Sequence, residues 1–465
     1  MKKLGLYVLA LLVGAISITS CDFEDTNIDP SRPTDADLRL ILPQVITQTA
    51  YNQSSNNARI AGIIMQYYEG FDAQQVAYTD YVIGEDVFNS YWRLGLYAGA
   101  LRSAQNIIDK TADIDAPYYE AIAKVLLAEN YATAASMFGD IPMSQALQGA
   151  DNLKPVYDSQ EQVYQRVQEL LDEAIVLFSG DAGSVVPSAD DLIFGGDAAA
   201  WIATAHALKA RYMSHTSMRD PDSWNKILST IENSAFQTSA EAPYFNYGTT
   251  QNDNNPLAKF GVDRPNTLVI DNRLEANMSE RMDPRRDFYM EEGDGAFLYY
   301  SANPQLIWAQ NSASIPFISY TELLFLKAEA QQRTGASRED VQATLASAIQ
   351  SSLDLVGASS ETFAANQANL DGKSDEEIIQ TIVEEAYYSY YGISFLQTWT
   401  NFRRTGYPAL TPSSTGANGL NPSGVVPVRF LYPVSESQTN SENLEQAKSR
   451  QGGALLDAKL WSFGG

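Results

Sequence analysis

The chain of 465 residues carries 31 lysines and arginines against 57 aspartates and glutamates, which gives a formal net charge of −26 at pH 7. This acidity favours solubility and excludes a nucleic-acid-binding protein, which needs a basic stripe to contact phosphates. The single cysteine, Cys21, leaves no thiol pair for a disulfide, so the hydrophobic core has to stabilise the fold alone.

The N-terminus is typical of an exported lipoprotein. Two lysines precede an apolar run, Leu4 to Ile18, that is too short to cross a bilayer and has the character of a signal peptide. The sequence Ile18-Thr19-Ser20-Cys21 is typical of a bacterial lipobox. We therefore expect residues 1–20 to be removed, Cys21 to be acylated, and residues 21–36 to form a tether. A plain secreted protein with one stray thiol is the alternative.

Acylation of Cys21 predicts attachment to a membrane by lipid alone. Each buried methylene contributes about 0.8 kcal/mol, so two or more acyl chains hold a soluble domain firmly on a leaflet. The acidic stretch Asp22-Phe23-Glu24-Asp25 resembles the surface-export signal of Bacteroidetes lipoproteins. The expected location is the outer membrane, with the protein facing the cell exterior.

Most of the remaining chain has apolar residues at helical spacing, which predicts a mainly α fold. Two capping boxes, Ser159 with Gln162 and Ser374 with Glu377, mark helix starts. Interleaved small residues, as in Ala199-Ala200-Trp201, are typical of tetratricopeptide-like helical repeats, although no fixed period is present. The predicted helices span residues 118–135, 160–178, 198–213, 318–333 and 376–391.

Two segments interrupt the helical pattern, at residues 240–316 and 404–434. Both are rich in Pro, Gly, Asn and aromatic residues, which predicts loops and short strands inserted into the helical repeats. No Pro-rich or Ser-rich hinge divides the chain, so we expect residues 37–465 to form a single domain. Inserted loops on a rigid scaffold often carry functional contacts.

The sequence contains no phosphate-binding loop, no HExxH pair and no GxSxG elbow. Its two histidines, His206 and His215, are nine positions apart and lie on different faces of one predicted helix, so they do not form a metal clamp. The loop Glu291 to Gly295 offers oxygen ligands for calcium, but it lacks the spacing of an EF-hand. No cofactor is therefore predicted, and structural calcium has no support.

The aromatic residues are the most informative feature. Tyrosines and other aromatics gather in residues 67–92 and 297–308, where flat rings beside polar side chains suit the apolar face and hydroxyl rim of a sugar. Core packing is the alternative role for each ring. The candidate ligand-binding residues, chosen because they lie among polar or turn-forming neighbours, are Tyr78, Asp80, Tyr81, Asn89, Tyr299, Trp308 and Gln310.

A series of short motifs resembles the SusD/RagB nutrient-binding lipoproteins of Bacteroidetes, over nearly all of the mature chain. Besides the lipobox, the matching stretches are Asn27 to Pro30, Trp92 to Asn106, Phe138 to Pro142, Pro155 to Asp158, Met282 to Arg285, Pro316 to Glu329, Trp399, Arg403 to Pro408, Val428 to Pro433, and Glu436. Each is weak alone, but their order and spacing are specific.

The resemblance implies a tetratricopeptide-like α fold that acts as a lid on a SusC-like TonB-dependent outer-membrane transporter. The protein is then expected to bind a glycan, or a peptide, and to catalyse nothing. Because the ligand sites of this family lie in variable loops, no motif transfers a binding residue. Two alternatives stay open: a surface glycoside hydrolase that uses paired carboxylates, such as Glu384-Glu385, and a structural repeat scaffold that binds no ligand.

Overall fold

The computed structural model describes residues 36–465, so the predicted signal peptide, Cys21 and nearly all of the tether lie outside the described residues. Within this part the protein is mainly helical, which confirms the predicted fold class. The helices of the first half are α2 (Leu38–Ser54), α3 (Asn56–Ile64), α4 (Gln74–Thr79), η2 (Tyr91–Leu101), α5 (Arg102–Thr111), α6 (Pro117–Phe138), α7 (Gln160–Phe178), α8 (Ala198–His215) and α9 (Ser223–Asn233).

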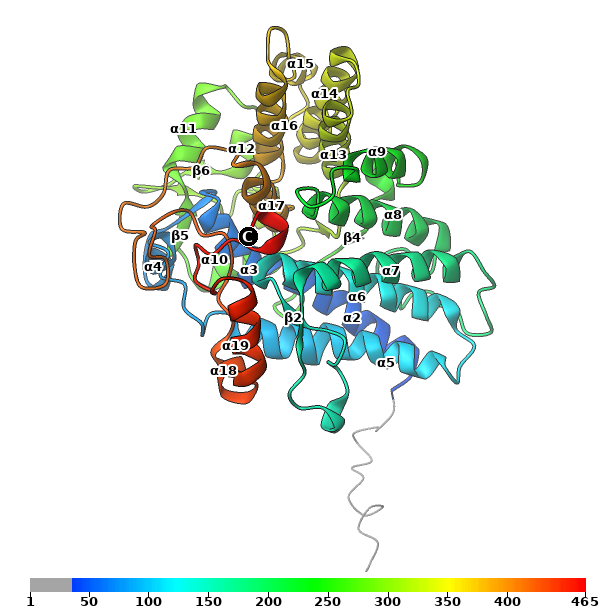
Figure 1. Cartoon of the computed structure of the whole chain (residues 1–465). Helices are drawn as coiled ribbons and strands as arrows, with labels where there is room; N and C mark the ends of the chain where they lie inside the picture. Colours follow the sequence, from blue (N-terminus) through cyan, green and yellow to red (C-terminus); the bar gives the residue numbers. More distant parts are fainter. Residues whose placement is uncertain (1–35) are drawn as a thin grey trace, which may run out of the picture.

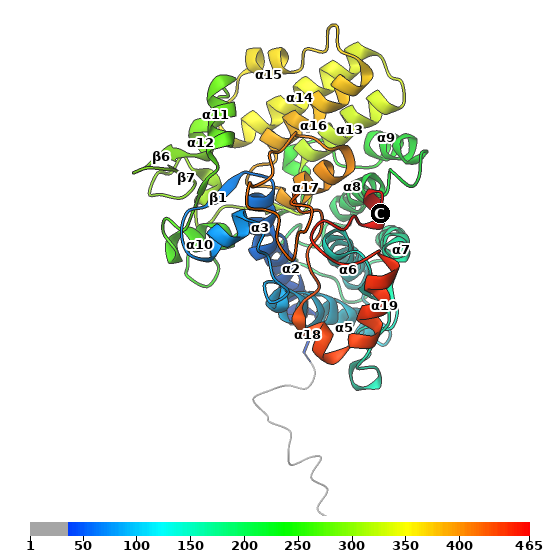
Figure 2. The same ribbon diagram turned by 60° about the vertical axis from the view of Figure 1, so that its left-hand side comes forward.

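The second half continues this array after an insert. Its helices are α10 (Pro256–Asp263), α11 (Asn272–Glu280), α12 (Arg286–Tyr289), α13 (Tyr320–Arg333), α14 (Arg338–Val356), α15 (Glu361–Gln367), α16 (Asp375–Ser389), α17 (Phe395–Thr405), α18 (Val434–Thr439) and α19 (Ser441–Arg450). In space, α6, α7, α8, α9 and α13 each pack against the next, and α13 also packs against α14 and α16 (Figures 1 and 2). The stacked arrangement matches the predicted helical repeats.

All five helices predicted from apolar spacing are present, as α6, α7, α8, α13 and α16. Both capping boxes form. The Ser159 N–H donates to Gln162 Oε1 at 2.9 Å, and the Ser374 N–H donates to Glu377 Oε2 at 2.7 Å. Each box satisfies backbone donors that the first turn of a helix leaves free, and this explains why α7 and α16 begin there.

Short antiparallel strand pairs lie between the helices. They are β1 (Tyr68–Gly70) with β5 (Leu268–Ile270), β2 (Ile141–Pro142) with β3 (Tyr157–Asp158), β4 (Tyr244–Phe245) with β8 (Ile315–Pro316), and β6 (Glu291–Glu292) with β7 (Phe297–Leu298). Residues 240–316 contain most of these strands, together with α10, α11 and α12, which the sequence pattern did not predict. These helices have four to nine residues, too short for a clear apolar period.

One helix of the N-terminal half is wider than an α-helix. Residues Tyr91–Leu101 form the π-helix η2, which continues directly into α5. The backbone of η2 lies close to α2, because Asn52 Nδ2 donates to the Gly95 carbonyl at 3.1 Å and a Cβ at Gly95 would lie 2.5 Å from Asn52 Oδ1. Glycine at position 95 therefore permits this contact, which places the start of η2 along the exposed edge of α2.

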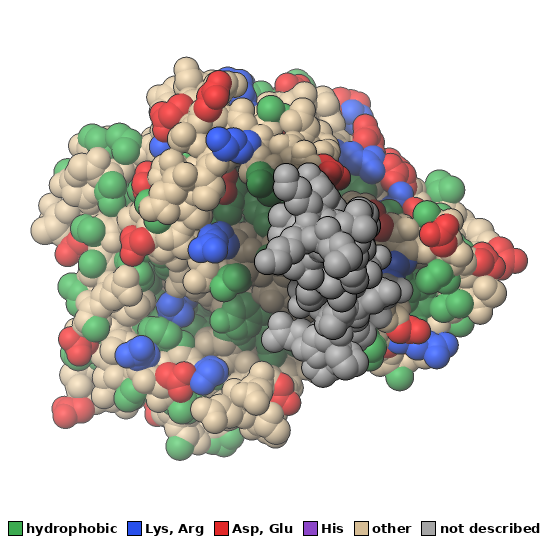
Figure 3. All heavy atoms as spheres, turned by 90° about the horizontal axis from the view of Figure 1, so that it is seen from below, with side chains coloured by type: hydrophobic (Ala, Val, Ile, Leu, Met, Phe, Trp, Pro, Cys, Tyr) green, Lys and Arg blue, Asp and Glu red, His purple; other side chains and the backbone are tan. Residues whose placement is uncertain are grey.

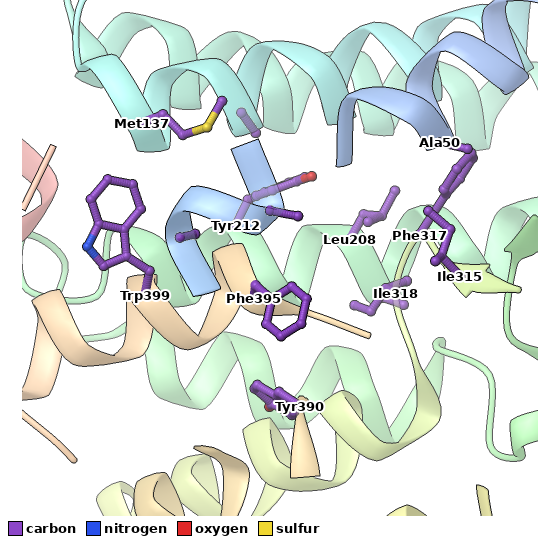
Figure 4. Close-up of a cluster of buried hydrophobic side chains, with 14 of the residues drawn as sticks. Ala50, Met137, Leu208, Tyr212, Ile315, Phe317, Ile318, Tyr390, Phe395 and Trp399 are labelled. Carbon is purple, nitrogen blue, oxygen red and sulfur yellow. The ribbon is translucent and has the colours of Figure 1, made fainter. Parts of the chain in front are cut away.

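The core lies where α2, α6, α8 and α17 meet the strand β8 (Figure 4). A buried polar cluster crosses this core. Arg211 donates to both carboxylate oxygens of Glu322 at 2.6 Å, and it lies 3.6 Å from Glu129. His215 Nε2 donates to Gln397 Oε1 at 2.8 Å, and its Nδ1 accepts from the Tyr164 hydroxyl at 2.9 Å. The hydrogen bonds on both ring nitrogens fix the orientation of the imidazole.

This buried histidine predicts a specific acid sensitivity. Burial, and then the positive charges of Arg211 and Arg403, lower the pKa of His215 from 6.5 to about 3. Below pH 6.5, His215 binds a proton in the unfolded chain, whereas in the folded chain it stays neutral until about pH 3. The free energy of unfolding therefore decreases across this window, on the order of 1 kcal/mol per pH unit.

We expect His215→Gln to reduce this slope, at some cost in stability at pH 7. Urea unfolding between pH 7 and pH 4.5 measures it. The matched control is His206→Gln on the same helix, which removes a half-buried histidine and should change the slope less. Equal slopes in the wild type and His215→Gln would show that His215 is not the group responsible.

Candidate functional site

A groove with a volume of about 1090 Å³ lies between two parts of the chain that are far apart in sequence. One side consists of α2, the start of α3 and the start of η2. The other side is the insert from β4 through α10. Polar and aromatic residues dominate its lining, which includes Gln48, Tyr51, Asn52, Asn56, Arg59, Tyr91, Leu94, Leu192, Phe245, Tyr247, Gln251, Asn252, Asp253, Asn254, Lys259, Phe260 and Asp263.

The groove presents apolar surface to solvent. Tyr51 on α2 is 51% exposed, and Leu94 on η2 is 66% exposed. Amide side chains, among them Gln48, Asn56 and Gln251, lie along the same lining. Sites for small polar ligands combine apolar contact surfaces with a few hydrogen-bonding groups in this way. An exposed tyrosine ring surrounded by amides has the two kinds of surface that a sugar ring presents, an apolar face and a polar rim.

The insert wall of the groove is fastened to the helical scaffold. The hydroxyl groups of Ser54 on α2 and Tyr247 on the insert lie 2.7 Å apart. Within the insert, Asn255 Nδ2 donates to the Ala313 carbonyl at 3.0 Å, and β4 pairs with β8. The wall therefore has a fixed position relative to α2, as a preformed binding site requires.

Three polar atoms of the groove residues are buried without a hydrogen-bond partner among the described residues. They are the Tyr91 hydroxyl, Arg59 Nε and Asn254 Oδ1. A buried polar group without a partner costs about 1–3 kcal/mol, so folded proteins seldom leave several at one place. A hydroxyl group supplies both the acceptor that Arg59 Nε lacks and the donor that Asn254 Oδ1 lacks.

The first group of sequence-predicted residues lies beside the groove and binds another loop. Tyr78 and Tyr81 are buried. The Tyr81 hydroxyl accepts from the Ser413 N–H at 3.2 Å, and Asp80 Oδ1 accepts from the Ser413 hydroxyl at 3.0 Å. Asn89 Oδ1 accepts from the Ser435 N–H at 3.1 Å. These polar groups fasten the C-terminal loops to the segment that precedes η2.

The second group lies in the insert. Tyr299 is buried and packs edge-on against Tyr68, with ring centroids 5.2 Å apart. Trp308 lines a closed cavity of about 30 Å³ next to Gly392, which is too small for a sugar. Gln310 Nε2 donates to the carbonyls of Asn303 and Leu306, both at 3.1 Å.

None of the seven candidates lines the groove. The structure does bring the two aromatic regions together, through Tyr68 and Tyr299, and it places Tyr78 and Tyr299 close enough to Arg59 to act on its charge. Direct contact of the seven residues with a ligand stays a prediction. The sequence analysis selected neither Tyr51 nor the amide-rich run Gln251 to Asn255. Tyr51 could have been found as a large aromatic on the solvent side of a helix.

Surface charge does not form a continuous basic patch on the face seen in Figure 3, where acidic and basic side chains are interspersed. The described part of the chain contains no group of three or more His, Cys, Asp or Glu side chains arranged to hold a metal ion. Between residues 36 and 465, no helix combines the length and the apolar character needed to cross a membrane.

Comparison with known proteins agrees with this architecture. Residues 30–433 match the SusD-like family described as "Starch-binding associating with outer membrane". A SusD/RagB family protein from Bacteroides thetaiotaomicron has a TM-score of 0.76 and 23% identity, with 93% of this chain and 100% of that chain covered. A SusD homolog from Bacteroides fragilis has a TM-score of 0.72 and 21% identity, with 92% and 99% covered.

A further solved structure, a chitin-binding protein, has a TM-score of 0.76 and 21% identity, with 92% of this chain and 100% of that chain covered. No curated protein matches the chain. At 21–23% identity, similarity to these structures shows the fold alone. The family match covers residues 30–433, which is most of the sequence. The chain therefore belongs to the SusD-like family, whose members are starch-binding and associate with the outer membrane.

Proposed function

We propose that the protein is a lipid-anchored nutrient receptor that captures an oligosaccharide in the groove and delivers it to a SusC-like TonB-dependent transporter. The observation that carries the proposal is the groove of about 1090 Å³, in which the exposed Tyr51 ring lies among amide side chains. Membership of a starch-binding family and similarity to a chitin-binding protein support a glycan ligand over a peptide.

Binding without catalysis fits the placement of the buried acids better than glycoside hydrolysis does. A hydrolase needs a carboxylic acid with a raised pKa inside the substrate cleft. Burial raises the pKa of Glu129 and of Glu385. However, Glu129 lines a cavity of only about 50 Å³, and Glu385 accepts a hydrogen bond from Arg281 at 2.5 Å. Neither carboxyl group lines the groove, so we infer that a bound glycan leaves unchanged.

We expect Tyr51→Ala to weaken glycan binding about tenfold or more, which corresponds to ~1.4 kcal/mol for a lost aromatic contact at the centre of a site. Isothermal titration of the purified lipoprotein, in a detergent without a sugar head group, measures the affinity for maltohexaose and chitohexaose. Chromatography of the same samples after a day should recover both hexasaccharides intact.

Phe71→Ala is the matched control, because Phe71 is 54% exposed and lies outside the groove residues. Its affinity for the hexasaccharides should equal that of the wild type. Equal weakening by both variants, or unchanged binding in Tyr51→Ala, would refute the placement of the ligand. Shortened saccharides would refute the proposal that the protein is not an enzyme.

The anchor makes a separate prediction. Cys21→Ser should abolish incorporation of radiolabelled palmitate and move the protein from the membrane fraction to the soluble fraction, since no acyl chain then holds the domain. Ser20→Ala, which keeps a small residue before the cysteine, should leave both properties unchanged. A wild-type chain that keeps its leader and takes up no palmitate would contradict the lipid anchor.

The transporter partnership has its own test. Failure of a barrel protein to co-purify with the lipoprotein would contradict it.

A further inference from the structure

We propose that the ligand of the groove is an acidic glycan, and that Arg59 on α3 binds the carboxylate of one of its uronic acid units. The inference rests on the proposed function and narrows its ligand class from oligosaccharides in general to those that carry a negative charge. The observation behind it is a half-buried guanidinium in the groove lining that no acid of the described chain neutralises.

The side chain of Arg59 is held in one position. Its guanidinium carbon lies 3.9 Å from the centre of the Phe260 ring, which belongs to α10 on the opposite wall. Arg59 Nη2 donates to Asn56 Oδ1 at 2.6 Å, and Asn56 Nδ2 in turn donates to the Val87 carbonyl at 3.3 Å. Stacking on one face and a hydrogen bond at one edge fix the plane of the guanidinium before any ligand arrives.

The remaining donors of Arg59 have no partner within residues 36–465. Its Nε is buried and makes no hydrogen bond, and no hydrogen bond joins Nη1 to the described chain. Asn56 occupies one hydrogen of Nη2, so Nη1 is the terminal donor left for a ligand. A carboxylate at this nitrogen neutralises the guanidinium, whereas a neutral hydroxyl leaves the charge unpaired.

Other buried arginines show how unusual Arg59 is in this acidic chain. Arg211, Arg285 and Arg404 each pair with a carboxylate, at 2.6 Å, 2.6 Å and 2.5 Å. Arg403 and Arg429 lack an acidic partner but donate to backbone carbonyls, those of Ser136 and Phe138 among them. Arg59 has neither kind of partner.

Desolvation adds to the cost of the unpaired charge. Burial lowers the pKa of Arg59, and the groups that act on its charge, Tyr299, Tyr78 and Tyr51, are phenols rather than carboxylates. Unlike Arg59, the basic groove residue Lys259 is neutralised by Asp263 at 2.8 Å. A ligand carboxylate at Arg59 supplies the opposite charge that the folded chain lacks there. It therefore offsets the cost of desolvating the guanidinium.

Titration of the full lipoprotein with charged and neutral hexasaccharides tests the inference. The acidic probes are hexamers of galacturonate and of mannuronate and a hyaluronan hexasaccharide, and the neutral probes are maltohexaose and chitohexaose. We expect at least one acidic probe to bind at least tenfold more tightly than both neutral probes. Its affinity should fall as the salt concentration is raised from 50 to 500 mM, roughly as expected when a charge pair is screened.

Arg59→Gln should weaken binding of that acidic probe at least tenfold and remove most of its salt dependence, while neutral probes change little. Arg59→Lys, which keeps the charge but not the planar guanidinium, should recover part of the affinity. Arg264→Gln is the matched control, because Arg264 is an exposed arginine of the same insert outside the groove lining. It should behave like the wild type.

The outcomes separate the two proposals. Neutral probes that bind as tightly as the acidic ones, with no effect of salt on the wild type, overturn the acidic ligand and leave the glycan receptor intact. The salt series needs no variant, so it decides the question even if Arg59→Gln fails to fold. Absence of binding by all five probes overturns the glycan receptor, and the acidic ligand with it.

Discussion

Glu436 ties the C-terminal segment to the helices that shape the groove. Its carboxylate accepts from Trp92 Nε1 at 3.0 Å and from the Tyr157 hydroxyl at 2.6 Å. Phe430 stacks on Phe88 with centroids 4.1 Å apart, and its N–H donates to the Met137 carbonyl at 2.8 Å. These contacts hold η2 against α6, and η2 supplies one edge of the groove. A segment with little regular structure thus determines where the binding surface lies.

The motifs that resemble the family serve this framework more than the ligand. Asp140 accepts from the Gln160 N–H at 3.0 Å and from Arg450 Nη2 at 2.7 Å, and the Tyr432 hydroxyl donates to the Asp140 carbonyl at 2.7 Å. Asp283 pairs with the fully buried Arg285. Such residues conserve geometry, whereas Tyr51 and Arg59 lie outside the motifs. Membership of the family therefore accounts for the fold, and the proposed ligand contacts lie at other positions.

The helices were predictable because apolar spacing and capping boxes are local signals, as α7 and α16 show. The groove was not predictable, because it forms between segments such as Ser54 and Tyr247, which are 193 positions apart. Aromatic density does not report the exposure of a ring, for a related reason. Tyr299 lies in an aromatic-rich stretch and Tyr51 does not, yet the Tyr51 ring is half-exposed on a helix and the Tyr299 ring is buried against Tyr68. Exposure of a ring depends on what packs over it, and the local sequence does not contain that information.

The acidity of the chain and a positive group in its groove act over different distances. At physiological ionic strength charges separated by more than about 8 Å are largely screened, so the overall net charge of −26 opposes an anionic ligand only weakly once contact is made. At contact, the unpaired Arg59 dominates because it is close, fixed and partly desolvated. The same net charge discourages anionic polymers from collecting elsewhere on the surface. The proposed preference for an acidic sugar then depends on one local cation in a chain of negative net charge.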